Sequence, residues 1–162
     1  MVNLSLYEKL ASDASYHKVF QSNDGALFQH QDAINDDLTE NLEVGIILAI
    51  SGRIVELPAR NKSGKNPDFL IDGVATEMYT PQSPKNGKKA FTHAIEKGIY
   101  QAILRWDTEF SINQLIGAIR FGFKHNNVIS LCLILANHIV IEILRQEFTD
   151  NTFVNKIKKA LQ

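Results

Sequence analysis

The side chains best placed to do chemistry surround one predicted β-hairpin in the middle of the chain. Asp72-Gly73 stands between two apolar runs, and this dipeptide predicts a tight hairpin turn because both central turn positions favour a positive φ. Alternation along the second strand places Glu77 and Tyr79 on one face and Met78 on the other. A carboxylate and a phenol on one face make that face polar and potentially reactive, with Glu77 expected to be partly exposed.

Other candidate side chains lie on the elements before and after this hairpin. Asp68 enters its first strand, Glu43 lies in the first turns of a predicted helix, and Thr92 and His93 open the helix that follows. Each also has a purely structural explanation. An Asp after a proline often hydrogen-bonds nearby backbone, and an acidic residue early in a helix complements the helix dipole. A histidine on the exposed face of a helix, shared here with Glu96 and Lys97, needs no function at all.

The elements that position these residues follow from periodicity and from turn residues. Thr39 and Ser111 open two helices, and Ser51-Gly52 ends the first of them. The pattern predicts helices at residues 3–20, 39–50, 91–103, 112–124 and 151–161, and strands at 53–57, 69–71, 74–79, 104–106, 129–135 and 139–144, with a polar connection at 21–37. The fold class is therefore α+β, with a central, mostly antiparallel sheet packed by the N-terminal and middle helices.

Composition bounds the class of protein. The 162 residues suit one globular domain, and a lone cysteine, Cys132, excludes an internal disulfide. The longest apolar runs are too short to span a membrane, and the N-terminus lacks an export signal. Net charge is −1, yet residues 60–105 hold 8 basic and 4 acidic groups. This local basic field can attract a polyanion.

The order of these features resembles a known group of bacterial toxin domains. Four features occur in the same order in the C-terminal nuclease domains of contact-dependent growth inhibition and polymorphic toxins. They are the helix with Glu43, the strand at residues 54–57, the segment from Pro67 to Gly73 with Glu77 four residues later, and residues 94–102. The resemblance covers residues 40–147, and Pro67 to Gly73 with Glu77 is its most specific part.

The resemblance implies a fold, an activity and a partner. It implies the fold shared by barnase, EndoU and RelE, with residues 1–39 as a helical entry segment and 40–162 as the nuclease domain. The implied activity is that of a ribonuclease, a hydrolase acting on tRNA in the cytoplasm of a target cell. A larger secreted carrier would deliver the domain, and a cognate immunity protein would neutralise it. We expect no membrane partner.

The metal-independent interpretation gives each candidate residue a role. Glu77 would take the proton of the ribose 2′-hydroxyl, Tyr79 would bind phosphate or act as the acid, and Thr92 and His93 would meet phosphate at the start of their helix. The family has a lysine where this chain has Tyr79, so a cation is missing from the strand. Four residues of the basic segment and the later helix are candidates to replace it and to bind substrate: Lys85, Lys88, Lys89 and Arg120.

Two alternatives stay open from the sequence. Glu43, Asp68 and Glu77 also fit the acidic set of a PD-(D/E)xK nuclease, in which carboxylates hold Mg²⁺. The preferred interpretation needs no cofactor, and none of the five histidines stands at metal-ligand spacing. The second alternative is a degenerate member that keeps the fold and binds RNA or protein. In either nuclease interpretation, the helices beginning near Thr39 and Ala90 and the hairpin should converge on one cleft.

Overall fold

The computed structural model describes residues 3–33, 37–62, 64–106 and 109–162, which fall into two compact units, residues 1–75 and 76–162. Both units combine helices with a sheet that contains antiparallel as well as parallel strand pairs, so the predicted α+β class is confirmed. Within the described residues, no helix has the length and apolar character needed to cross a bilayer.

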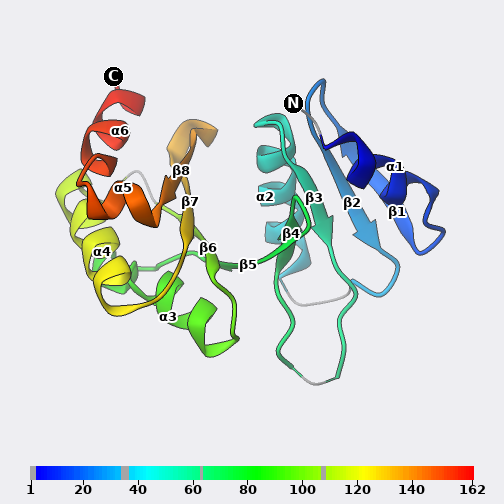
Figure 1. The fold of residues 1–162 in the computed structure, drawn as a ribbon, viewed down its shortest axis with the longest axis horizontal. Helices are drawn as coiled ribbons and strands as arrows, with labels where there is room; N and C mark the ends of the chain where they lie inside the picture. The colour runs from blue at the N-terminus through cyan, green and yellow to red at the C-terminus, as the bar shows by residue number, and fades with distance from the viewer. Residues whose placement is uncertain (1–2, 34–36, 63, 107–108) are drawn as a thin grey trace. The chain divides into compact units, whose positions relative to one another are not determined.

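The first unit is a four-stranded sheet with a helix on each face. Its elements are α1 (Leu4–Ser12), β1 (Tyr16–Gln21), β2 (Ala26–His30), α2 (Leu38–Ile50), β3 (Ile54–Leu57) and β4 (Phe69–Ile71). The strands lie in the order β1-β2-β3-β4, with β2 and β3 parallel and the outer pairs antiparallel. Leu10 of α1 packs on Ala26, Phe28 and Ile54, whereas α2 lies against Leu27 on the opposite face (Figure 1).

The second unit carries the remaining elements. They are β5 (Val74–Tyr79), which begins at the end of the first unit, η1 (Pro84–Asn86), α3 (Lys89–Glu96), β6 (Gln101–Arg105), α4 (Ile112–His125), β7 (Ser130–Ile134), η2 (Ala136–His138), β8 (Val140–Leu144), α5 (Arg145–Thr149) and α6 (Phe153–Ala160). The order is β5-β6-β7-β8, and β6 is parallel to both neighbours while β8 is antiparallel to β7.

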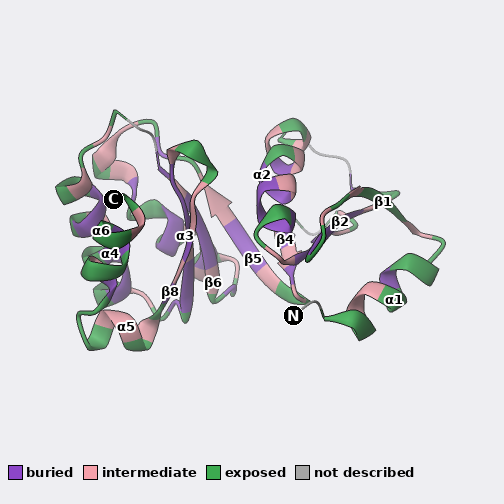
Figure 2. Cartoon of the chain, turned by 90° about the horizontal axis from the view of Figure 1, so that it is seen from above, coloured by how far each residue is buried: buried purple, intermediate pink, exposed green. Residues whose placement is uncertain are grey.

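Aromatic rings join the helices of the second unit. Phe91 of α3 meets Phe123 of α4 edge to face at 5.0 Å, and Phe123 stacks on Phe148 of α5 at 5.4 Å between ring centroids. Arg145 donates hydrogen bonds to the carbonyls of Val128 (3.0 Å) and Phe123 (3.1 Å), which ties the start of α5 to the end of α4. In Figure 2 the buried residues gather on the strands and on the inner sides of the helices.

Two elements differ from the sequence prediction. The helix expected over residues 3–20 ends at Ser12, and β1 takes the place of its last part. Strand β2, which pairs with β1, lies within the expected polar connection, of which residues 34–36 lie outside the described residues. The helix expected to reach Ile103 ends at Glu96 because Gly98, at φ 72°, provides a left-handed stop, and residues 101–105 form β6. The predicted functional division at residue 39/40 stays a prediction.

Two glycines of α4 provide a matched test of this packing. A Cβ at Gly122 would lie 2.1 Å from Cδ2 of the buried Phe91 ring, whereas a Cβ at Gly117 would meet no atom. We expect Gly122→Ala to lower the free energy of unfolding by about 1–3 kcal/mol through overpacking. Gly117→Ala should raise it by about 0.5–1 kcal/mol through helix propensity. Urea denaturation of both variants measures the difference, and equal effects would contradict the packing of α3 on α4.

A buried carboxylate on the α1 face of the first sheet predicts a pH dependence. Glu56 is 5% exposed, and burial raises its pKa, although a hydrogen bond with Tyr16 and the charge of Lys9 act in the opposite direction. Burial and the charge of Glu56 also raise the pKa of Tyr16 to about 12. A raised pKa means that the folded state holds the proton more tightly, so this contribution to stability is present at low pH and is lost as pH rises through the folded-state pKa.

We therefore expect Glu56→Gln to become more stable relative to the wild type as pH rises from about 4 towards neutrality. The measurement is the urea midpoint of both proteins across that range. Glu8→Gln, at an exposed carboxylate of α1, is the control and should follow the wild-type curve. Parallel curves for Glu56→Gln and the wild type would contradict a raised pKa of Glu56.

Candidate active site on β5 and α3

Strand β5 and helix α3 bring two of the predicted site residues together with two others. Glu77 and Tyr79 stand two residues apart on one face of β5, about 7 Å along the strand. His93 and Lys97 stand four residues apart along α3 and its C-cap, about 6 Å along the helix axis. The two spacings match. Tyr79 therefore meets His93 edge to face at 4.9 Å between ring centroids, and Glu77 Oε1 lies 2.7 Å from Lys97 Nζ.

The four side chains form one pair with a buried carboxylate, Glu77 with Lys97, and one half-buried pair, Tyr79 with His93. Glu77 is 5% exposed rather than partly exposed, and its carboxylate receives the Lys97 ammonium. Tyr79 and His93 are half-buried and remain open to solvent on one side. Thr92 is exposed. A substrate therefore meets the Tyr79–His93 pair more readily than it meets Glu77.

Lys97 is the residue that sequence analysis missed. It was expected on the exposed face of a longer helix, but the helix ends at Glu96 and the Lys97 side chain lies on the buried Glu77 carboxylate. Its ammonium places next to β5 a positive charge of the kind that the resemblance led us to expect at the position of Tyr79. The spacing in the sequence could have indicated this contact. Lys97 follows His93 by four residues of helix, which is nearly the same length as the two residues of strand from Glu77 to Tyr79.

The four cations predicted to replace the strand lysine lie elsewhere in the second unit. Lys85 and Lys88 line a groove of about 360 Å³ between η1 and α4, together with Gln114 and Phe121. Lys88 Nζ lies 4.5 Å from the centre of the exposed Phe121 ring. Arg120 instead donates to Asn151, just before α6, at 3.3 Å and lies over the ring of Phe153 in α6.

Lys89 is exposed at the start of α3. The groove lined by Lys85, Lys88 and Phe121 combines positive charge with an exposed aromatic ring, which is the combination that binds single-stranded nucleic acid. Of the four predicted substrate-binding residues, Lys85 and Lys88 thus share a surface that suits the predicted role. That role stays a prediction.

The remaining two predicted carboxylates belong to the first unit. Asp68 forms an ion pair with Arg60 at 3.3 Å just before β4, and Glu43 is exposed on α2. Asp72 fixes the hairpin turn, because its side chain accepts the Ile54 N–H at 2.9 Å and pairs with Arg53 at 2.6 Å. Among the described residues, no group of three or more His, Cys, Asp or Glu side chains stands close enough to hold a metal ion. Convergence of α2 with the hairpin and α3 stays a prediction.

The Glu77–Lys97 pair has a measurable effect on stability. Glu77→Gln leaves a partly buried ammonium without its counter-charge, so we expect the free energy of unfolding to fall by about 1–3 kcal/mol. Lys97→Met should cost a similar amount, and the double variant should cost less than the sum of the two. Urea denaturation of the four proteins completes this cycle. Glu96→Gln, one residue away and exposed, is the control. Additive costs would show that the pair does not interact.

One family of known proteins matches part of the chain. Residues 65–140 match the family described as the contact-dependent growth inhibition CdiA C-terminal domain. The match includes Asp68, the hairpin, α3 and the basic groove. No curated protein matches the chain.

A solved structure shows the same fold. It is described as a CdiA-CT/CdiI toxin and immunity complex from Burkholderia pseudomallei, and it is 17% identical to this chain. The match has a TM-score of 0.50 and covers 67% of this chain and 84% of that one. At this identity the likeness concerns the fold alone. Together with the family match over residues 65–140, it agrees with the resemblance seen in the sequence to C-terminal toxin domains of the contact-dependent growth inhibition type.

Proposed function

We propose that this toxin domain is a ribonuclease that cleaves tRNA by attack of the ribose 2′-hydroxyl on the adjacent phosphate. The observation that carries the proposal is the cluster on β5 and α3, where the half-buried Tyr79–His93 pair lies beside the Glu77–Lys97 ion pair. A phenol, an imidazole and an ammonium on one surface are the groups that such a reaction requires. It needs a proton acceptor, a proton donor and a cation near the phosphate.

The exposure of each group favours a division of roles. Oε1 of Glu77, which was expected to accept the 2′-hydroxyl proton, already receives the Lys97 ammonium, so His93 is better placed as the acceptor. Tyr79 then donates to the departing 5′-oxygen or to a phosphate oxygen. Lys97, positioned by Glu77, stabilises the negative charge that develops on the phosphate. Thr92 lies beside His93 in the first half of α3, where a hydroxyl can hydrogen-bond phosphate.

A Mg²⁺-dependent PD-(D/E)xK nuclease is the second candidate, and Lys97 favours it too. A lysine in contact with an acidic residue of the hairpin's second strand is the pairing that such nucleases use. The carboxylates proposed as ligands are Glu43, Asp68 and Glu77, of which Glu77 pairs with Lys97; a bound Mg²⁺ would supply charge stabilisation and an activated water, but the described residues show no group of three such side chains close enough to hold it. In that reaction Lys97 would orient the water or the scissile phosphate.

An immunity protein is the proposed partner. The matching structure is described as a toxin and immunity complex, and a nuclease that acts on tRNA must be neutralised in the cell that makes it. The exposed cations of the basic groove, Lys85 and Lys88, give an acidic inhibitor a surface to cover. Delivery into a target cell by a larger carrier is part of the same proposal.

Purified protein incubated with total tRNA tests the activity and separates the two reactions. We expect cleavage that persists in EDTA and leaves a 2′,3′-cyclic phosphate, because attack by the 2′-hydroxyl closes that ring. Cleavage that stops on chelation, returns with Mg²⁺ and leaves no cyclic end would instead establish the metal-dependent reaction. Intact tRNA in both conditions would overturn the nuclease proposal and favour a binding module.

Variants of the cluster test the assigned roles. His93→Ala and Tyr79→Phe should each lower the cleavage rate by about a hundredfold or more, the usual loss for one acid–base group. Lys97→Met should lower it by a similar factor through lost charge stabilisation. His125→Ala, at an exposed histidine on α4, is the matched control and should cleave at the wild-type rate. Wild-type cleavage by His93→Ala would remove His93 from the mechanism.

A further inference from the structure

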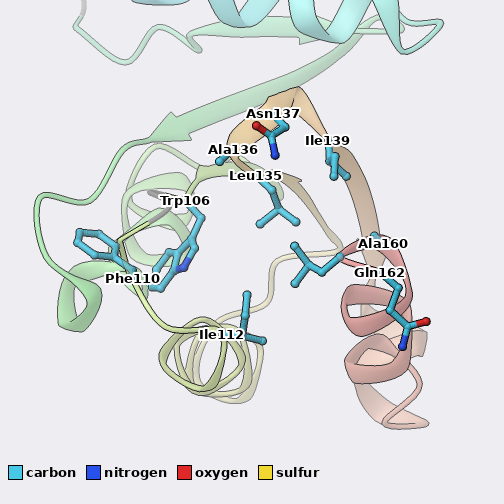
Figure 3. A pocket seen from close by; sticks show the side chains of 10 residues that line it. Trp106, Phe110, Ile112, Leu135, Ala136, Asn137, Ile139, Ala160 and Gln162 are labelled. Carbon is cyan, nitrogen blue, oxygen red and sulfur yellow. The ribbon is translucent and has the colours of Figure 1, made fainter.

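A cavity of about 400 Å³ opens at the carboxyl ends of strands β6 and β7 in the second unit. Its walls are mainly apolar and aromatic, with Trp106, Phe110, Leu135 and Ile139 among the lining residues, and Asn137 adds an amide (Figure 3). Trp106 and Phe110 meet edge to face at 5.2 Å between ring centroids. A space of this size accepts a small planar molecule, and an apolar lining with few polar groups is typical of ligand sites.

The indole of Trp106 points to a ligand with a hydrogen-bond acceptor. Trp106 is 4% exposed, and its Nε1–H is buried with no hydrogen-bond partner among the described residues. Figure 3 shows this nitrogen turned towards the interior of the cavity. Buried indole N–H groups are normally satisfied, because an unpaired donor loses its bond to water and gains nothing in return. A bound acceptor would satisfy this donor.

A second, more polar cavity of about 340 Å³ adjoins the first. The two share Trp106 and Asn137 among their lining residues, and the second adds Arg105, His138 and Thr80. Asn137 and His138 both have φ 62°, a conformation that is costly for such residues and that is often found at ligand sites. The combined space therefore has an aromatic end and an end with hydrogen-bonding and cationic groups.

The place of the two cavities in the fold supports a ligand site. Strands β5, β6 and β7 are parallel, and ligands of such sheets bind at the carboxyl ends of the strands. Thr80 follows Tyr79 directly, so the polar cavity begins one residue beyond the catalytic cluster. A ligand that fills both cavities would lie next to the proposed site of cleavage.

We propose that these cavities bind one nucleotide of the RNA substrate. Its base enters the aromatic cavity and accepts a hydrogen bond from Trp106 Nε1–H, and its ribose and phosphate face Arg105, Thr80 and His138. Sequence-specific RNA recognition usually places unstacked bases on aromatic side chains in this way. The inference rests on the proposed ribonuclease function and adds a specificity pocket to it, with Asn137 contacting the edge of the base.

Trp106 is the single tryptophan of the chain, so its fluorescence reports the cavity directly. The experiment titrates the wild-type protein with each of the four ribonucleoside 5′-monophosphates, using ribose 5-phosphate and inorganic phosphate as controls. We expect saturable quenching by at least one nucleotide and none by either control. No saturable change with any nucleotide up to about 10 mM, the weak end of measurable binding, would overturn the proposal.

Two variants test the contacts. Asn137→Ala should weaken nucleotide binding by about five- to tenfold, the size expected for one lost hydrogen bond, whereas Asn127→Ala, exposed and outside the cavities, should bind as the wild type does. Trp106→Phe keeps an aromatic ring without the N–H. In tRNA cleavage this variant should raise KM by about five- to tenfold, as expected for one lost hydrogen bond, while kcat stays within about twofold of the wild-type value. A fall in kcat alone would overturn the assignment of Trp106 to binding.

The result separates this inference from the proposed function. If tRNA is cleaved but nucleotides leave Trp106 fluorescence unchanged, the ribonuclease proposal stands and the pocket proposal fails. If nucleotides quench saturably but tRNA stays intact, the pocket binds nucleotides and the catalytic proposal fails. If only the cognate immunity protein changes the fluorescence, the cavity is part of a protein interface and the nucleotide proposal is overturned.

Discussion

The contact between β5 and α3 depends on one buried ion pair. Glu77 is 5% exposed and would be costly to bury alone, but Lys97 places its ammonium 2.7 Å from the carboxylate. Because the pair fixes one end of α3 on the strand, the matching spacing of strand and helix brings His93 to Tyr79 at the other end. The stabilising interaction and the proposed catalytic one are thus neighbouring contacts between the same two elements.

A second set of interactions holds the hairpin that leads into β5. Asp72 adopts φ 50° and Gly73 φ 84°, as a tight turn requires, and Asp72 also bonds to the backbone of Ile54 and to Arg53. The turn residue therefore anchors the hairpin to β3 as well as reversing the chain. Asp68 has a comparable role through Arg60. Asp68 and Asp72 near the turn are thus structural, whereas Glu77, a few residues later, holds a lysine beside the proposed site.

Turn chemistry and helix periodicity were enough to predict most of the fold. The Asp72-Gly73 hairpin, the helix beginning near Thr39, the Ser111 cap of α4 and the final hairpin are confirmed. Strands β1 and β2 were not predicted. Asp24-Gly25 also stands between two strands, but neither residue adopts the positive φ of the Asp72-Gly73 turn, and the surrounding polar residues suggested a loose connection. The sequence identified Tyr79 and His93 as candidate site residues but did not predict that their rings meet. Lys97 was missed because the predicted helix continued through Gly98.

Lys97 reaches Glu77 because it lies on the same face of α3 as His93. Successive residues of an α-helix are rotated by about 100°, so a residue four positions after His93 returns to nearly the same side of the helix and faces the same strand. At the C-cap the ammonium also lies at the negative end of the α3 dipole, which adds to the attraction of the carboxylate. A lysine on β5 would be held by the strand itself. A cation at the end of α3 keeps its charge beside β5, but its position depends on how α3 packs against the strand.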